Sequence, residues 1–117
     1  MTAVKMDMER ARFNMIEQQI RTWEVLDPAV LAMLAAVRRE DFVPEGLEAL
    51  AFADLELPIG NGQRMLQPKI EARILQEVAI KNTDIVLEVG TGSGYMAALL
   101  ASQAEYVHSV EIDPVLA

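Results

Sequence analysis

The sequence predicts an α/β protein in which N-terminal helices precede the start of a parallel sheet. Two observations predict this fold. Apolar residues recur at helical spacing in three segments before residue 82, and two runs rich in β-branched residues, 85–87 and 106–110, then flank a glycine-rich turn and a short apolar helix. The order strand, helix, strand is that of a parallel βαβ unit. Two strands do not make a covered sheet, so we expect the fold to be incomplete in this chain.

Two helices are predicted in the first 40 residues. From Met8 onward, an amphipathic helix with one packed face is predicted by the apolar side chains Phe13, Ile16, Ile20 and Trp23. Asp27 followed by Pro28 has the pattern of an N-cap with proline at the first helical position, and a second apolar stripe follows. We expect this helix to end near Arg39 and the mixed charges of residues 38–41 to form a solvated helix end.

The middle of the chain contains a predicted loop and a third helix. Regular strand pairing is not expected in residues 54–68, which contain Pro58, Gly60, Asn61, Gly62 and Pro68. That connection is long, and long ordered loops are often functional. Helical spacing returns at Ile70 and continues to Lys81.

The last third of the chain is predicted to form the βαβ unit. Residues 85–87 are expected to form a buried strand, because apolar residues follow one another without alternation. A short helix, 95 to about 103, leads to a second strand, 106–110, and Asp113 with Pro114 repeats the pattern of a helix start. We therefore expect a single domain, 1–117, made of a helical region in 1–58, a substrate-side loop and helix in 59–83, and the first βαβ unit in 84–117.

The composition limits the classes of partner and compartment. The 117 residues carry 18 acidic and 10 basic side chains, and acidic residues outnumber basic ones in both halves, so nucleic acid is not an expected partner. With no cysteine and a single histidine, His108, the chain has no disulfide, thiolate site or histidine cluster, and no metal is expected. No apolar stretch approaches the roughly 18 residues of a membrane span. We expect a cytoplasmic protein without a membrane partner.

The glycine-rich turn is the strongest functional signal. Gly90, Gly92 and Gly94 alternate between a strand and a helix, where only glycine lets the backbone turn sharply against a ligand. A dinucleotide fingerprint would need its third glycine at Tyr95, and the Gly-Lys-Ser/Thr ending of a phosphate loop is absent. The carboxylate of Glu88 would repel a pyrophosphate and attract an ammonium or sulfonium group. These residues favour a cationic nucleoside over a tight turn without a ligand.

A second acidic residue supports that interpretation. Glu111 lies 21 residues past Gly90, at the end of the second strand, where acidic side chains of such folds accept hydrogen bonds from ribose hydroxyls. Together these features predict binding of S-adenosylmethionine. The candidate cofactor-binding residues are Glu88, Gly90, Thr91, Gly92, Ser93, Gly94, Tyr95 and Glu111.

These residues resemble a known family. The segment 88–94 is similar to the first motif of class I S-adenosylmethionine-dependent methyltransferases. The chain from about Arg12 to Glu111 resembles the protein-L-isoaspartate O-methyltransferases, on the segments Phe42-Val43-Pro44, Leu57-Pro58-Ile59-Gly60, Gly62-Gln63, Gln67-Pro68 and Val110-Glu111. The resemblance implies the class I methyltransferase fold, a Rossmann-like, doubly wound parallel sheet with more strands than this chain holds. It also implies methyl transfer to the free carboxylate of isoaspartyl residues in damaged proteins or peptides, as a repair reaction.

One segment departs from the family pattern. Where the family usually has Thr-Ile-Ser, this sequence has Arg64, Met65 and Leu66. Leu66 cannot donate a hydrogen bond, so one contact that orients the acceptor is lost, although a carboxylate needs orientation more than a general base. Arg64 is the candidate replacement, through a bidentate grip on a carboxylate, with a solvated loop cation as the alternative. Gln63 and Gln67 are candidate substrate-binding residues.

The alternatives to an isoaspartyl methyltransferase are a diverged carboxylate substrate and a non-catalytic role. An incomplete sheet is also compatible with a fragment or interaction module that binds neither cofactor nor substrate. A nucleotide-dependent oxidoreductase is disfavoured by Glu88 and Tyr95. Unpaired strand edges are templates for pairing, so a homo-oligomer formed through them is expected.

Overall fold

The computed structural model describes residues 2–112, with side chains from residue 8 onward. The predicted helix start at Asp113 and Pro114 lies outside the described residues. The helices are α1 (Thr2–Met15), α2 (Pro28–Ala36), α3 (Pro68–Val78) and α4 (Tyr95–Ala101), and the strands are β1 (Leu57–Gly60), β2 (Gln63–Met65), β3 (Ile85–Val89) and β4 (Tyr106–Val110). Short helical turns join them at Ile16–Ile20, Arg21–Trp23, Arg39–Phe42 and Glu48–Leu50.

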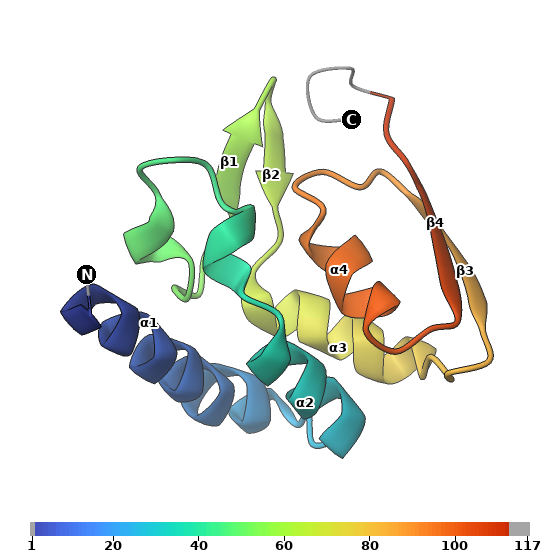
Figure 1. Cartoon of the computed structure of the whole chain (residues 1–117), viewed down its shortest axis with the longest axis horizontal. Coiled ribbons are helices and arrows are strands. Elements are labelled where there is room, and N and C mark those ends of the chain that lie inside the picture. The colour runs from blue at the N-terminus through green and yellow to red at the C-terminus, as the bar shows by residue number, and fades with distance from the viewer. Residues whose placement is uncertain (1, 113–117) are drawn as a thin grey trace.

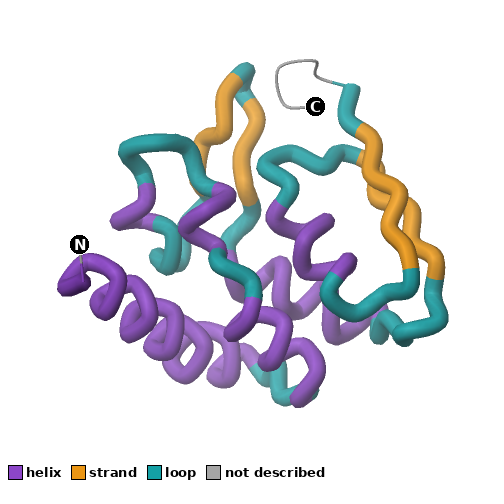
Figure 2. Tube along the Cα trace, viewed as in Figure 1, coloured by secondary structure: helices purple, strands orange, loops and turns teal. Residues whose placement is uncertain are grey.

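The helices occupy one side of the molecule and the parallel strands the other. Figure 1 shows α1 and α2 on the side opposite β3 and β4, with α3 and α4 between them. The β1–β2 hairpin stands beside the loop that leads into α4, as the tube in Figure 2 also shows. The buried core joins all these parts, with Ile20, Leu34, Leu75 and Leu99 each at most 2% exposed.

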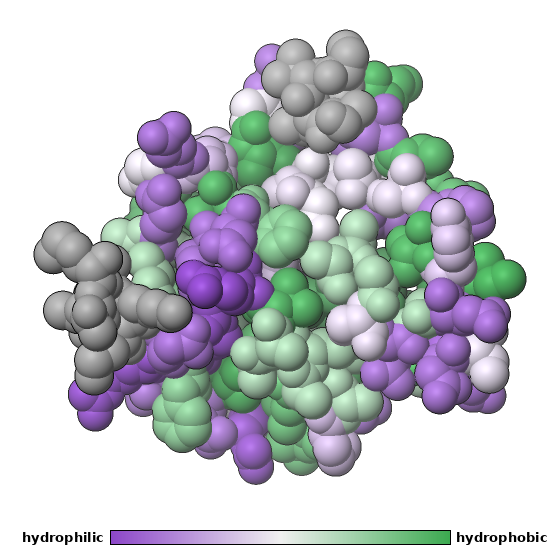
Figure 3. All heavy atoms as spheres, in the orientation of Figure 1, coloured by the Kyte–Doolittle hydropathy of each residue, from purple (hydrophilic) through white to green (hydrophobic). Residues whose placement is uncertain are grey.

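The predicted βαβ unit is confirmed, but its first strand is buried on one face only. β3 and β4 pair in parallel, with Ile85 opposite Tyr106. Val86 packs against the core, whereas Leu87 is 66% exposed and Val89 is 78% exposed. Helices cover only one face of the two-stranded sheet, so the prediction of a fully buried strand is wrong. Figure 3 shows hydrophobic residues at the surface on the side where these strands lie.

The predicted loop at 54–68 contains a hairpin, and the expectation that its glycines prevent pairing is wrong. β1 and β2 pair antiparallel, with Leu57 opposite Met65. Gly60 and Gly62, with φ of +106° and +75°, flank Asn61, whose φ is +52°. Glycine and asparagine adopt positive φ readily, so the same residues that interrupt a strand can form the turn between two strands.

The predicted packed face of the first helix is only partly confirmed, and a π-helical turn follows α1. Residues Ile16–Ile20 form a π-helical turn, so side chains after it point in other directions than a regular helix predicts. Ile16 and Ile20 are buried as predicted, whereas Phe13 is 64% exposed and Trp23 is 44% exposed. The predicted packing of Phe13 is therefore wrong. Trp23 is half-buried, and the Lys69 Nζ lies over its ring, 4.4 Å from the ring centre.

The second helix begins as predicted and ends earlier. The Asp27 side chain accepts a hydrogen bond from the Ala29 N–H at 2.9 Å, so it is the N-cap, with Pro28 at the first helical position. The helix ends at Ala36, before Arg39. Residues 38–41 are not a solvated helix end, because Arg39 is 1% exposed and Glu40 is 7% exposed. Glu40 forms an ion pair with the buried Arg12 of α1. Two residues of this charged run, Arg39 and Glu40, therefore lie in the core.

Candidate functional site

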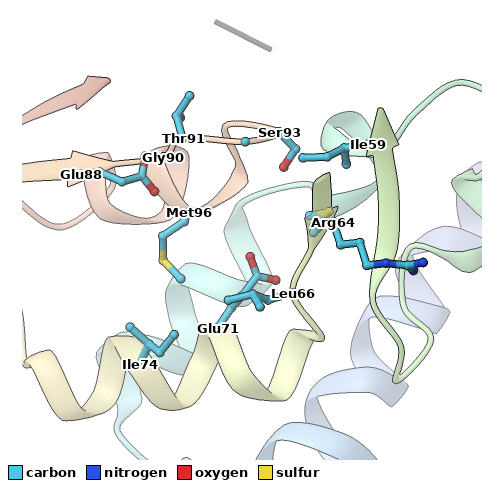
Figure 4. Close-up of a pocket in the computed structure, with 12 residues that line it drawn as sticks. Ile59, Arg64, Leu66, Glu71, Ile74, Glu88, Gly90, Thr91, Ser93 and Met96 are labelled. Carbon is cyan, nitrogen blue, oxygen red and sulfur yellow. The ribbon is translucent and has the colours of Figure 1, made fainter. Parts of the chain in front are cut away.

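A cavity of about 220 Å³ lies between the hairpin, α3 and the glycine turn. Figure 4 shows that its wall combines residues of β2, α3, β3 and the start of α4. The lining residues are Ile59, Arg64, Met65, Leu66, Glu71, Ile74, Glu88, Gly90, Thr91, Gly92, Ser93 and Met96. The hairpin that the sequence did not predict thus forms one wall of the cavity.

The glycine turn has open space at Gly90, whereas a Cβ on Gly92 would lie 3.2 Å from the Ile59 side chain. Gly90, Gly92 and Gly94 have φ of +84°, +56° and +87°, a region that residues with a side chain rarely adopt. A Cβ on Gly90 would meet no atom within 4 Å, so the space beside this backbone is free. The N–H groups of Gly90 and Thr91 donate to the Val110 carbonyl at 2.7 and 3.2 Å, which ties the turn to the end of β4.

Glu88 lies at the carboxyl end of β3 and lines the cavity. Ser109, its neighbour on β4, donates a hydrogen bond from Oγ to Glu88 Oε1 at 2.6 Å. This bond fixes the carboxylate beside the glycine turn. The strand and its acidic residue therefore present a negative charge at the place where the turn exposes its backbone.

Glu111 holds the turn from the other strand. Its Oε1 accepts a hydrogen bond from the Gly92 N–H at 2.8 Å. The side chain is half-buried and is not among the residues that line the cavity. Part of its hydrogen-bonding capacity is thus used to support the glycine turn.

A buried ion pair behind the cavity was missed by the sequence analysis. Arg39 donates from Nε to the Ala51 carbonyl at 2.6 Å, from Nη2 to the Leu66 carbonyl at 2.8 Å, and from Nη1 to Glu71 Oε1. Glu71, on α3, lines the cavity although it is only 4% exposed. Burial raises the pKa of Glu71 to about 7, Arg39 opposes that shift, and Glu88 adds to it.

The sequence holds a partial signal for Glu71 and none for Arg39. Glu71 lies four residues before the buried Leu75, on the apolar stripe of α3, where a carboxylate interrupts the hydrophobic pattern. Arg39 sits in a run of mixed charges, a pattern that is typical of a solvated surface. Its burial depends on partners far along the chain.

The residues expected at the acceptor site lie on or near the hairpin. Arg64 is exposed on β2, and Figure 4 shows its side chain extending away from the glycine turn. Leu66 lines the cavity, is 40% exposed, and offers its carbonyl to Arg39. Gln63 is exposed at the start of β2, and Gln67 precedes α3 as its N-cap residue without a side-chain cap. Neither glutamine lines the cavity.

Tyr95 differs from its expected position beside a ligand. Its side chain is 1% exposed and does not line the cavity. The ring lies 4.8 Å from the guanidinium carbon of Arg39 and 5.7 Å from the ring of Phe42. The expectation that this side chain touches cofactor or substrate is therefore corrected, because the first turn of α4 directs it into the core.

Neither a metal site nor a membrane-spanning helix is found among the described residues. Within residues 2–112, no three histidine, cysteine, aspartate or glutamate side chains gather closely enough to hold a metal ion. In the same range, every helix is too short or too polar to cross a bilayer.

Comparison with known proteins identifies relatives over nearly the whole chain. The family model described as Protein-L-isoaspartate(D-aspartate) O-methyltransferase matches residues 10–116. A protein-L-isoaspartate O-methyltransferase of Methanoculleus marisnigri is 48% identical over 108 residues, which cover 92% of this chain and 49% of the relative. One of Picosynechococcus sp. is 48% identical over 106 residues, covering 91% and 48%. The chain thus spans about half the length of these curated relatives.

A solved structure supports the fold. A Plasmodium falciparum protein described as a protein-L-isoaspartate O-methyltransferase, in complex with S-adenosyl-L-homocysteine, aligns with a TM-score of 0.73 and 20% identity. The alignment covers 93% of this chain and 50% of that chain. The helices, the hairpin and the βαβ unit described here therefore form part of a class I methyltransferase fold.

The raised pKa of Glu71 predicts a pH-dependent stability. The folded protein holds this proton more tightly than the unfolded chain, so it binds more protons between about pH 4.5 and pH 7. The free energy of unfolding should therefore fall across that window as the pH rises, by up to about 3 kcal/mol from this group. Urea unfolding at several pH values measures the effect.

The matched variants are Glu71→Gln and Glu77→Gln, on the same helix. Glu77 is exposed and pairs with Arg73, so its replacement should leave the pH profile of the wild type intact. Glu71→Gln should flatten the profile between pH 4.5 and pH 7. A Glu71→Gln profile parallel to that of the wild type would contradict the assigned cause.

Proposed function

The chain belongs to the protein-L-isoaspartate(D-aspartate) O-methyltransferase family, and on this basis we propose that it contributes the S-adenosylmethionine-binding part of a methyltransferase. The acceptor is the free carboxylate of L-isoaspartyl residues in damaged proteins or peptides, or a diverged carboxylate substrate. The observation that carries the proposal is the open backbone at Gly90, which lines the same cavity as the Glu88 carboxylate. Negative charge beside an open backbone favours a cationic ligand over a phosphorylated one.

The chain's own residues have separate roles in cofactor binding. Glu88 attracts the positive charge of the ligand, and the backbone of residues 90–94 allows its close approach. Glu111, already bonded to Gly92, is the proposed partner of the ribose hydroxyls. When bound, S-adenosylmethionine supplies a methyl group on a positively charged sulfur.

The acceptor side needs orientation more than proton transfer. A carboxylate oxygen is a competent nucleophile, so residues here need to hold it in line and keep water away. Arg64 is the proposed grip on the acceptor carboxylate, and Gln63 and Gln67 are proposed to hold amides of the substrate backbone. Leu66 contributes an apolar wall without a hydrogen-bond donor.

A second candidate function is an incomplete, non-catalytic module. The bare face of the β3–β4 sheet favours it, since Ile85, Leu87 and Val89 are 66–78% exposed. Such a module would bind neither cofactor nor acceptor. For both candidate functions, we also propose a cytoplasmic location and no nucleic-acid or membrane partner. The reasons are the excess of acidic over basic residues and the absence of cysteine in the sequence.

A matched pair of glycine variants tests cofactor binding. Gly90 and Gly46 both have positive φ, +84° and +92°, and a Cβ at either would meet no atom within 4 Å. Both alanine variants should lose about 1–2 kcal/mol of stability, because the left-handed conformation disfavours a side chain. Only Gly90→Ala adds a methyl group at the cavity, so it alone should weaken S-adenosylhomocysteine binding, by roughly tenfold or more.

Isothermal titration at 25 °C measures these affinities. Equal binding by the wild type and Gly90→Ala would contradict the proposed ligand position. Absence of binding by the wild-type chain at millimolar S-adenosylhomocysteine would reject the cofactor proposal and favour the non-catalytic module.

Restoring a hydroxyl at residue 66 tests the acceptor proposal. Leu66→Ser should raise methyl transfer to an isoaspartyl peptide, by about threefold to tenfold, because one orienting hydrogen bond is worth about 0.5–1.5 kcal/mol. Transfer of radiolabelled methyl groups to the peptide provides the measurement. Leu50→Ser, an exposed position outside the cavity, is the control. Unchanged turnover in Leu66→Ser would mean that this contact does not orient the acceptor.

The strand edges predict self-association. The β3–β4 sheet has only two strands, so each of them has an unpaired edge in the described structure. Unpaired edges are templates for strand addition, so we propose a homo-oligomer formed through them. Light scattering of the purified chain should give at least twice the mass of 13.0 kDa. A folded species that is strictly monomeric would contradict this.

A further inference from the structure

Two carboxylates from different elements line the same cavity. Figure 4 shows Glu71 projecting from α3 and Glu88 projecting from β3 toward a common space. Arg64 is the one other charged residue among those that line this cavity, and its side chain extends away from the glycine turn. The interior of the cavity is therefore acidic.

Arg39 fixes one carboxylate oxygen of Glu71 by a hydrogen bond, and the other oxygen has no donor among the described residues. Its Oε1 accepts from Arg39, which is 1% exposed and is itself fixed by the carbonyls of Ala51 and Leu66. No donor to Glu71 Oε2 is found among the described residues. A carboxylate that is 4% exposed and fixed on one side has its second oxygen available on the cavity side.

A buried acidic group beside a second carboxylate is costly to keep charged unless a cation approaches. Arg39 supplies part of that compensation from behind. The cavity itself offers the remaining position for positive charge, between Glu71 and Glu88. A ligand with a positive charge there would relieve the repulsion between the two carboxylates.

We propose, on the basis of the proposed function, that Glu71 is a second anionic contact for the positive charge of the methyl donor, acting together with Glu88 across the cavity. Arg39 is the positioning residue that orients the Glu71 carboxylate. The pair of carboxylates would then discriminate the sulfonium of S-adenosylmethionine from the neutral thioether of S-adenosylhomocysteine.

The proposal predicts that ligand binding is coupled to a proton. The titratable groups that interact with Glu71 are Arg39, Tyr95 and Glu88, from the turn at 39–42, α4 and β3. Arg64 of β2 lines the same cavity. Because the pKa of Glu71 is raised to about 7, this carboxyl is partly protonated near neutral pH without a ligand. A sulfonium favours the charged carboxylate, so binding should release a fraction of a proton.

Titration calorimetry at pH 7 in two buffers of different ionisation enthalpy measures the released proton. S-adenosylmethionine and S-adenosylhomocysteine share their ammonium, carboxylate and nucleoside groups, so the difference between them reports on the sulfonium. We expect S-adenosylmethionine to release more protons than S-adenosylhomocysteine. In Glu71→Gln the difference should vanish, and the preference for S-adenosylmethionine should fall by about tenfold. Glu77→Gln, on the outer face of α3, should behave as the wild type.

The outcomes separate the two proposals. Binding of neither compound would overturn the proposed function. Binding of both with equal proton release in the wild type would overturn only the role of Glu71, and that result does not depend on whether the Glu71→Gln variant folds. An undiminished preference for S-adenosylmethionine in a folded Glu71→Gln protein would overturn it as well.

Discussion

The buried guanidinium of Arg39 is the interaction on which the site depends. It bonds to carbonyls at Ala51 and Leu66 and to the carboxylate of Glu71, and the ring of Tyr95 lies beside it. Those partners belong to four separate segments that meet behind the cavity. A buried arginine is stable only if its donors are satisfied and its charge is balanced, so these segments are positioned together. The cavity wall formed by the hairpin and α3 follows from that requirement.

The charge on the cavity follows from the same arrangement. The turn after β3 exposes backbone because its glycines adopt positive φ, and Glu88 lies at the start of that turn. Glu71 adds a second acidic group from α3, held in place by Arg39. In the proposed function, the exposed backbone admits a nucleoside, and the two carboxylates favour a positively charged ligand. The open backbone of the cavity therefore comes from the turn after β3, and part of its negative charge comes from α3.

Local features were predictable from the sequence, and long-range ones were not. The βαβ unit and the turn with Gly90 lie within one short segment, where strand pattern and glycine spacing are sufficient. The pair Arg39–Glu71 joins residues 32 apart, and in a linear pattern Arg39 is indistinguishable from a surface charge. The exposure of Phe13 depends on which face of α1 packs against distant parts of the chain. Predicting the hairpin required a choice between glycine as a strand breaker and glycine as a turn residue.

The proposed cavity selects a cationic nucleoside over one with a diphosphate. Competition titration of the 117-residue chain with S-adenosylmethionine and with NAD measures this preference. We expect S-adenosylmethionine to bind and NAD not to displace it, because two carboxylates repel the diphosphate. Preferential binding of NAD, with displacement of S-adenosylmethionine, would contradict it.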